Sequence, residues 1–170
     1  QNLTGFLFRK QAGLRPDSTL PVIKTDLQTL NLSEDLLVWF GHSSYLIQME
    51  GKRLLVDPVF CTAAPVSFVN KPFKGTEVYR PEDMPDIDWA ILENGQYNEG
   101  WKYIHLMPGY MAAVARELKA AKILTVHHSK YALATHPWDE PLKNARRMRD
   151  RDSLPVVIPQ IGEVVNMTGH

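Results

Sequence analysis

Histidine is the side chain best suited to proton transfer and metal binding near neutral pH, and it occurs six times among these 170 residues. His127 and His128 stand side by side directly after the apolar run 122–126. Neighbours on an extended strand point to opposite faces, so these two imidazoles are not expected to share one ion. A turn after His127 would change this, but a site of two histidines would still be weak. If His127 is not a metal ligand, we expect a strand-end histidine whose ring is hydrogen-bonded to the backbone.

Other residue types suited to chemistry are present without a pattern that brings them together. Glu93 and Glu99 resemble a general acid–base pair, but nothing in the sequence forces their carboxyl groups into contact. Cys61 is the one cysteine, lacks the neighbours of a nucleophile, and excludes an internal disulfide. His42 lies within a strand, where we expect a hydrogen-bonded polar side chain at a bulge. The alternative is that His42 supports the residues of a functional site. Asp57 is expected to fix the turn after a strand through its side-chain oxygen.

The elements that must position these residues are β-rich at first and then alternate between strand and helix. The expected strands are 37–40, 45–49, 53–56, 89–92, 122–126, 156–158 and 163–165. Pro108 is expected to open a helix, since its missing N–H costs nothing there, and a second helix covers 140–150 with Asp139 as its cap. This order favours an α/β fold with helices packed on a mixed sheet.

Composition narrows the class of protein. Hydrophobic residues make up 44% of the chain, and nineteen basic residues balance nineteen acidic ones, which disfavours a nucleic-acid partner. No apolar run approaches the length of a membrane span, and no signal-peptide pattern is seen. With a single cysteine, these features favour the cytoplasm. Residues 1–35 form a polar lead-in, and 36–170 are expected to form a single domain.

Several segments in order resemble one family. Asp35–Ile47 and Gly51–Phe60 are similar to the opening hairpins of metallo-β-lactamase-fold hydrolases. The segments Ala90–Asn98, Trp101–His105 and His136–Pro141 continue the match. The branch they resemble holds the N-acyl-phosphatidylethanolamine phospholipase D-like and ascorbate-6-phosphate lactonase-like enzymes. The resemblance implies a partial αββα sandwich, a fold in which two sheets pack together with helices outside.

The sequence departs from that family in its middle. In the family, the segment equivalent to Met84–Asp88 leads into a strand that ends in a His-x-His-x-Asp-His loop, which supplies most ligands of two metal ions. Here Asp88 continues directly into Trp89, and the strand that follows resembles one much later in the family. We therefore predict that a central block is missing, with its junction at 88–89. The alternative is that the natural protein carries this block and is an active zinc hydrolase.

The resemblance also assigns two candidate site residues. His127 matches the last metal ligand of the family, and His105 matches a position near the substrate cleft, where the alternative is a loop histidine beside Trp101 and Tyr103. Zinc belongs to the parent family, whose activity is metal-dependent hydrolysis of phosphodiester or related ester bonds. A catalytic zinc needs several converging ligands and an open position for water. We therefore expect no catalytic residue and no tightly bound metal in this chain, which is either inactive alone or a non-catalytic binding or assembly module.

Partners follow from the missing block. Its removal would leave open strand edges, which favour pairing with another chain, so self-association is expected. A basic helix end is formed by Lys143, Arg146, Arg147, Arg149 and Arg151. Such a face usually complements the helix dipole, and the alternative is weak contact with anionic lipid head groups.

Overall fold

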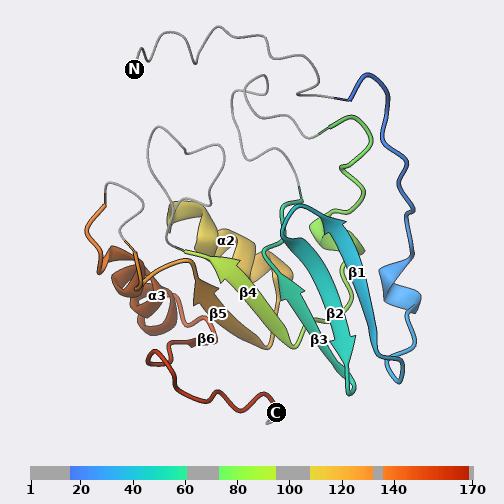
Figure 1. The fold of residues 1–170 in the computed structure, drawn as a ribbon. Coiled ribbons are helices and arrows are strands. Elements are labelled where there is room, and N and C mark those ends of the chain that lie inside the picture. The colour runs from blue at the N-terminus through green and yellow to red at the C-terminus, as the bar shows by residue number, and fades with distance from the viewer. Residues whose placement is uncertain (1–15, 61–72, 95–107, 132–135, 169–170) are drawn as a thin grey trace, which may run out of the picture.

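A computed structural model describes residues 16–60, 73–94, 108–131 and 136–168 of the chain (Figure 1). Within these residues, six strands form one sheet whose spatial order follows the sequence. The strands are β1 (Leu36–Gly41), β2 (Ser44–Met49), β3 (Lys52–Val56), β4 (Trp89–Glu93), β5 (Lys122–Val126) and β6 (Val156–Val157). The helices are α2 (Pro108–Leu118), α3 (Glu140–Asp150) and the short 3-10 helices η1 (Leu27–Thr29) and η2 (Pro81–Asp83).

The first three strands form an antiparallel meander. Met49 pairs with Lys52 across a two-residue turn, in which Glu50 and Gly51 have φ of 50° and 72°. Positive φ at both central residues is the geometry of a type I′ turn, whose twist matches that of the flanking strands. The turn at Glu50-Gly51 therefore lies between the expected strands 45–49 and 53–56. Between β1 and β2 the register shifts from Trp39 to Gly41, which is the irregularity expected near His42.

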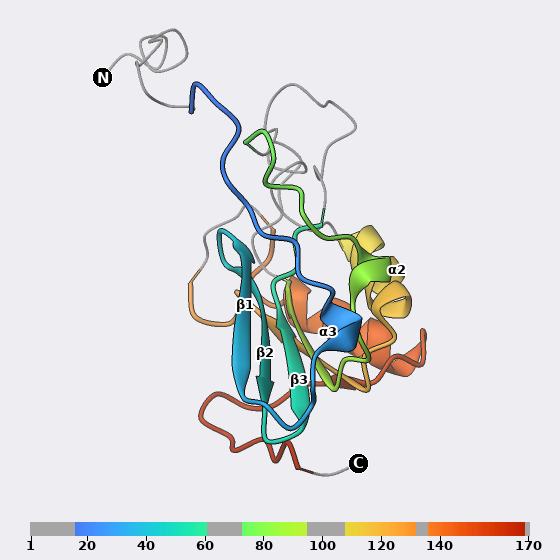
Figure 2. The same ribbon diagram turned by 90° about the vertical axis from the view of Figure 1, so that its right-hand side faces the viewer.

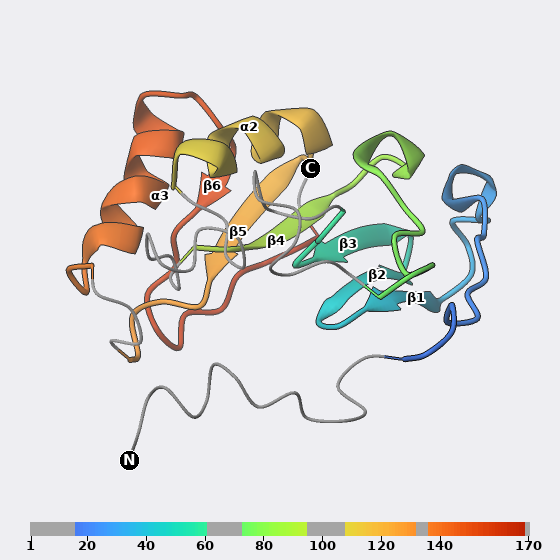
Figure 3. The ribbon, with the colours of Figure 1, turned by 90° about the horizontal axis from the view of Figure 1, so that it is seen from above.

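The second half of the sheet is parallel. β4, β5 and β6 follow β3 in parallel register, and α2 and α3 make the two crossovers between them. Figures 2 and 3 show both helices on the same face of the sheet. The predicted fold class, an α/β arrangement with a mixed sheet and helices outside, is confirmed.

The core lies between that face and the helices. Leu46, Leu55 and Ile123 of the sheet are completely buried, and they belong to one cluster with Met111 of α2 and Ala145 of α3. Burying a side chain of this size stabilises the folded state by about 1.5–3 kcal/mol relative to leaving it exposed to water. This cluster therefore fixes the orientation of the strands and with it the positions of the residues at their ends.

Two local predictions are wrong. Residues 163–165 form no strand, because the chain turns at Gly162, with φ of 87°, and Val164 is left exposed with no neighbouring strand to pair with. Asp139 does not cap α3 through its side chain. Its carboxylate instead lies 2.8 Å from Lys143 Nζ, and this contact lowers the pKa of Asp139.

The sheet face opposite the helices, called the open face below, is also apolar. Its side chains alternate with those of the core along each strand, and the paired registers place them in rows across the sheet. The open face consists of Leu37, Trp39, Tyr45, Ile47, Met49, Leu54, Val56, Trp89, Ile91, Leu124, Val126 and Val157. No helix of the described residues covers it (Figures 2 and 3).

Candidate functional site

Polar residues gather at one edge of the sheet. β1, β3, β4 and β5 point in the same direction, so their carboxyl ends meet at one side (Figure 1). Residues at or just beyond these ends make up what we call the carboxyl edge: His42, Ser43, Asp57, Glu93, Asn94, His127 and His128. In open α/β sheets, ligands bind outside the carboxyl ends of the strands, so this edge is the candidate site.

The backbone at the carboxyl edge takes up an unusual conformation. His42, Asp57, His127 and Ser129 have φ between 43° and 66°, in the left-handed region. This region costs roughly 1–2 kcal/mol for a residue other than glycine, and such residues gather at functional sites. The conformation turns each chain sharply as it leaves its strand. The side chains of these residues therefore stand at the edge instead of continuing the alternation of the sheet.

Asp57 and Ser43 join two of the turns. The Ser43 hydroxyl donates a hydrogen bond to Asp57 Oδ2 at 2.5 Å, and the backbone N–H of Asp57 donates to the carbonyl of Ile91 at 2.8 Å. Asp57 therefore links the β1–β2 turn to the end of β3, where the sequence suggests only a role in its own turn. A carboxylate held in this way has a structural role, and fewer of its lone pairs remain to coordinate a metal ion.

Glu93 and His127 lie beside each other at the carboxyl edge. Glu93 Oε1 lies 3.8 Å from His127 Nδ1, with the carboxylate side chain 11% exposed and the imidazole 47% exposed. The parallel register of β4 and β5, which sets Glu93 against Val126, explains why the two meet. The sequence singles out Glu93 only as a partner of Glu99, which lies outside the described residues. The signal that was available is that Glu93 ends a strand parallel and adjacent to the one that precedes His127.

His128 has different partners from His127. Its Nε2 lies 3.1 Å from the carbonyl of Thr125, and its Nδ1 lies 2.7 Å from Ser129 Oγ. A carbonyl oxygen only accepts, so Nε2 carries the proton and Nδ1 accepts from the hydroxyl. Burial lowers the pKa of His128, and the bond to Thr125 opposes this in part. A neutral ring with both nitrogens engaged is not available as a metal ligand.

Asn94 ties the carboxyl edge to the helix layer. Its side chain is fully buried, and Nδ2 donates to the carbonyl of Pro141, at the start of α3, at 2.8 Å. Among the described residues, Asn94 Oδ1 is the one buried side-chain oxygen or nitrogen without a hydrogen-bond partner. The amide therefore fixes where α3 begins relative to β4.

The donors at this edge do not make a zinc site. A catalytic zinc takes three protein ligands and a water. Within the residues that the structure describes, no group of three or more His, Cys, Asp or Glu side chains is arranged to hold a metal ion. His127 keeps one carboxylate, Glu93, beside it. The other candidate, His105, lies outside the described residues.

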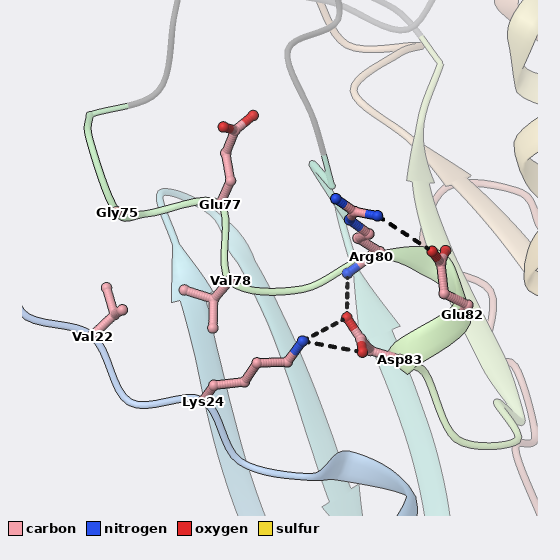
Figure 4. A pocket seen from close by; sticks show the side chains of 8 residues that line it. All are labelled: Val22, Lys24, Gly75, Glu77, Val78, Arg80, Glu82 and Asp83. Atoms are coloured by element: carbon pink, nitrogen blue, oxygen red, sulfur yellow. Dashed lines mark hydrogen bonds and ion pairs between the residues drawn. The ribbon is translucent and has the colours of Figure 1, made fainter.

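A separate pocket of about 530 Å³ lies beside η2 (Figure 4). Its cations face carboxylates: Lys24 Nζ lies 3.2 Å from Asp83 Oδ1, and Arg80 lies 3.9 Å from Glu82. The backbone N–H of Arg80 also donates to Asp83, and this bond is the main cause of the lowered pKa of Asp83, followed by Lys24. With Glu77, the lining carries three carboxylates against two cations, so it offers no net attraction to an anionic substrate.

Parts of the chain are similar to known proteins. An N-acyl-phosphatidylethanolamine-hydrolysing phospholipase D 1 of Caenorhabditis elegans is 35% identical over 88 residues, which are 48% of this chain and 24% of that protein. The outer membrane protein RomA of Klebsiella pneumoniae is 46% identical over 46 residues, which are 27% of this chain and 35% of RomA. An uncharacterised protein of Mycobacterium tuberculosis is 28% identical over 90 residues, or 51% of this chain and 24% of that protein.

These similarities support the metallo-β-lactamase-fold hydrolase superfamily for this chain. The chain spans only about a quarter to a third of the length of these relatives. No protein-family model matches it. Among the described residues, no helix has the length and apolar character needed to cross a bilayer.

Proposed function

We propose that this chain is a truncated member of the metallo-β-lactamase-fold hydrolases, of the phospholipase D-like branch, and that it is not catalytic alone. The parent activity is metal-dependent hydrolysis of phosphodiester or related ester bonds. The observation that carries the proposal is the composition of the carboxyl edge. There, His127 and Glu93 are the only imidazole and carboxylate among the described residues that lie within ion-pair distance of each other.

Asp57 and His128 of the carboxyl edge are committed to contacts within the chain. Asp57 accepts the Ser43 hydroxyl, and both ring nitrogens of His128 have partners inside the chain. The printed sequence contains no His-x-His-x-Asp-His run. Two metals that generate hydroxide and hold an oxyanion need donors from several strand ends at once. Within the part of the chain that the structure describes, no group of three or more His, Cys, Asp or Glu side chains meets that requirement.

The contacts around Asp88 support a junction at 88–89. The Asp88 carboxylate accepts the backbone N–H of Arg53 at 2.9 Å and lies 3.0 Å from Lys52 Nζ. Its own N–H donates to the carbonyl of Arg53, and its carbonyl accepts the N–H of Lys122. Asp88 therefore holds the start of β4 in place between β3 and β5. A chain joined at this point can build a continuous sheet without the central block.

Zinc content and phosphodiesterase activity test the proposal. The purified chain is loaded with zinc, desalted, and analysed for metal by mass spectrometry and for hydrolysis of bis-p-nitrophenyl phosphate. We expect less than one zinc per chain and no hydrolysis above the uncatalysed rate, for the unsubstituted chain and for His127→Ala alike. Two retained zinc ions, with turnover that His127→Ala abolishes, would refute the proposal. An intact mass larger than that of the printed sequence would instead identify a natural protein that carries further residues.

A non-catalytic assembly module is the second candidate function. The observation in its favour is the open face, an apolar sheet surface that a catalytic role at the carboxyl edge does not use. Binding assays separate the two candidates, because an assembly module associates without metal and without turnover.

A further inference from the structure

The open face carries exposed apolar side chains in one contiguous area. Trp39 is 68% exposed, and Leu37, two residues earlier on β1, and Met49 of β2 are also more than half exposed. Tyr45 and Ile47 of β2 lie opposite Trp39 and Leu37 in the paired register, and Met49 follows Ile47 on the same face of β2. Isolated exposed apolar residues are ordinary, but a contiguous patch of them marks an interaction surface.

The hydrogen bonding of Trp39 allows a partner to cover its ring. Its indole Nε1–H donates to the carbonyl of His42 at 2.9 Å. The one polar atom of the side chain is thus already paired, so covering the ring leaves no unsatisfied donor. Tryptophan in such a position is the residue type most enriched among the energetic centres of protein interfaces.

The size of the open face fits a weak association. Six strands about 4.8 Å apart and five residues of about 3.3 Å each give a flat area of roughly 29 by 16 Å, or about 460 Å². This is an upper value for the free part, because Trp89 at the amino end of β4 is only 5% exposed. A standard specific interface takes about 800 Å² from each partner, and weak encounters take less. A complex on this face is therefore expected to dissociate on dilution.

Charges on the rim of the open face select the orientation of a second copy. The alternation of β4 and β5 places Glu93 at its carboxyl rim and Lys122 at its amino rim. If a twofold axis parallel to the strands related the two copies, the carboxyl rims would lie against each other and so would the amino rims. An axis in the interface and perpendicular to the strands sets the carboxyl rim of one copy against the amino rim of the other, so that opposite charges meet.

We propose that the open face is a self-association surface, on which a second copy of this chain packs its own open face with strands antiparallel. Two twisted sheets that pack face to face keep their strand directions within about 30° and lie about 10 Å apart. The centre of the contact is the β1–β2 patch around Trp39. This surface is distinct from pairing at the strand edges, which uses backbone groups instead of apolar side chains. It does not depend on the proposed loss of catalysis.

Sedimentation velocity on the full chain between 5 and 500 µM tests the proposal. We expect the weight-average mass to rise from that of a monomer towards that of a dimer across this range. Trp39→Lys and Leu37→Lys are expected to remain monomeric throughout, and circular dichroism checks that each variant is folded. Trp138→Lys is the matched control, because Trp138 is 70% exposed but lies before α3 instead of on the sheet. It is expected to associate like the parent chain.

Lys122→Glu tests the orientation, with Lys119→Glu as its control at an exposed site after α2. We expect the first to raise the dissociation constant several-fold and the second to leave it unchanged. A parent chain that stays monomeric at 500 µM would overturn the proposal. Continued dimerisation of both Trp39→Lys and Leu37→Lys would also overturn it, in favour of strand-edge pairing. Equal loss in Trp138→Lys and Trp39→Lys would show that any exposed tryptophan drives the association and would equally overturn it.

Discussion

Replacement of Asp88 by alanine is expected to destabilise the sheet at the predicted junction. The carboxylate makes a charged hydrogen bond to the backbone of Arg53 and an ion pair with Lys52. Hydrogen bonds to charged groups contribute about 1.5–3 kcal/mol, while half-exposed ion pairs contribute about 0–1 kcal/mol. Water can reach the N–H that is left behind, because the side chain of Asp88 is 30% exposed. We therefore expect a loss of about 2 kcal/mol in the free energy of unfolding for Asp88→Ala.

Urea and thermal denaturation measure this loss. For a domain of this size, about 2 kcal/mol corresponds to a fall of roughly 4–8 °C in Tm. Lys52→Ala loses only the ion pair and is expected to lose less than about 1 kcal/mol. Asp88→Asn keeps a neutral acceptor for the Arg53 N–H and is expected to fall between Lys52→Ala and Asp88→Ala. If Asp88→Ala were as stable as Lys52→Ala, the hydrogen bond to Arg53 would not hold β4 to β3, and the reasoning would fail.

Three further predictions concern the core, the site and the pH dependence of stability. Leu46→Ala, at a fully buried position, is expected to lose about 2–5 kcal/mol in urea denaturation, and Leu37→Ala on the open face much less. Ser43→Ala removes the hydroxyl donor to Asp57 and is expected to lose about 1–2 kcal/mol, measured in the same way. The lowered pKa of His128 means that the unfolded chain binds the proton more readily, so stability falls as pH drops below about 6.5; titration of the free energy of unfolding should show a smaller fall in His128→Gln.

Local chemistry made much of the fold predictable from the sequence. The expected strands 45–49 and 53–56 left the β2–β3 turn between them, and Pro108 marked the start of α2. These features depend on residues close together in the chain. The strand predicted at 163–165 failed because strand formation needs a neighbour, and no described segment lies beside β6 to supply one.

The candidate site was less accessible to prediction because it depends on register. β5 ends at Val126 and His127 has a positive φ, so the strand alternation behind the predicted opposite faces of His127 and His128 does not apply, but His127 was identifiable as a residue that follows a strand. The partner of His127 was not, because Glu93 is 34 positions earlier in the sequence and reaches it only through the parallel pairing of β4 with β5. Left-handed backbone at Asp57 and His127 is likewise set by how the chains leave the sheet.

The exposure of the open face follows from topology more than from composition. Each added strand lies on the same side of the previous one, from β4 to β5 to β6, and each crossover is made by a helix. Right-handed crossovers that advance in one direction place successive helices on one face, as Figure 3 shows for α2 and α3. A helix on the other face would require the strand order to reverse, which does not occur in the described sheet. A second layer over Trp39 and its neighbours must therefore come from outside these helices, and another copy of the same apolar face is the partner whose rim charges are complementary.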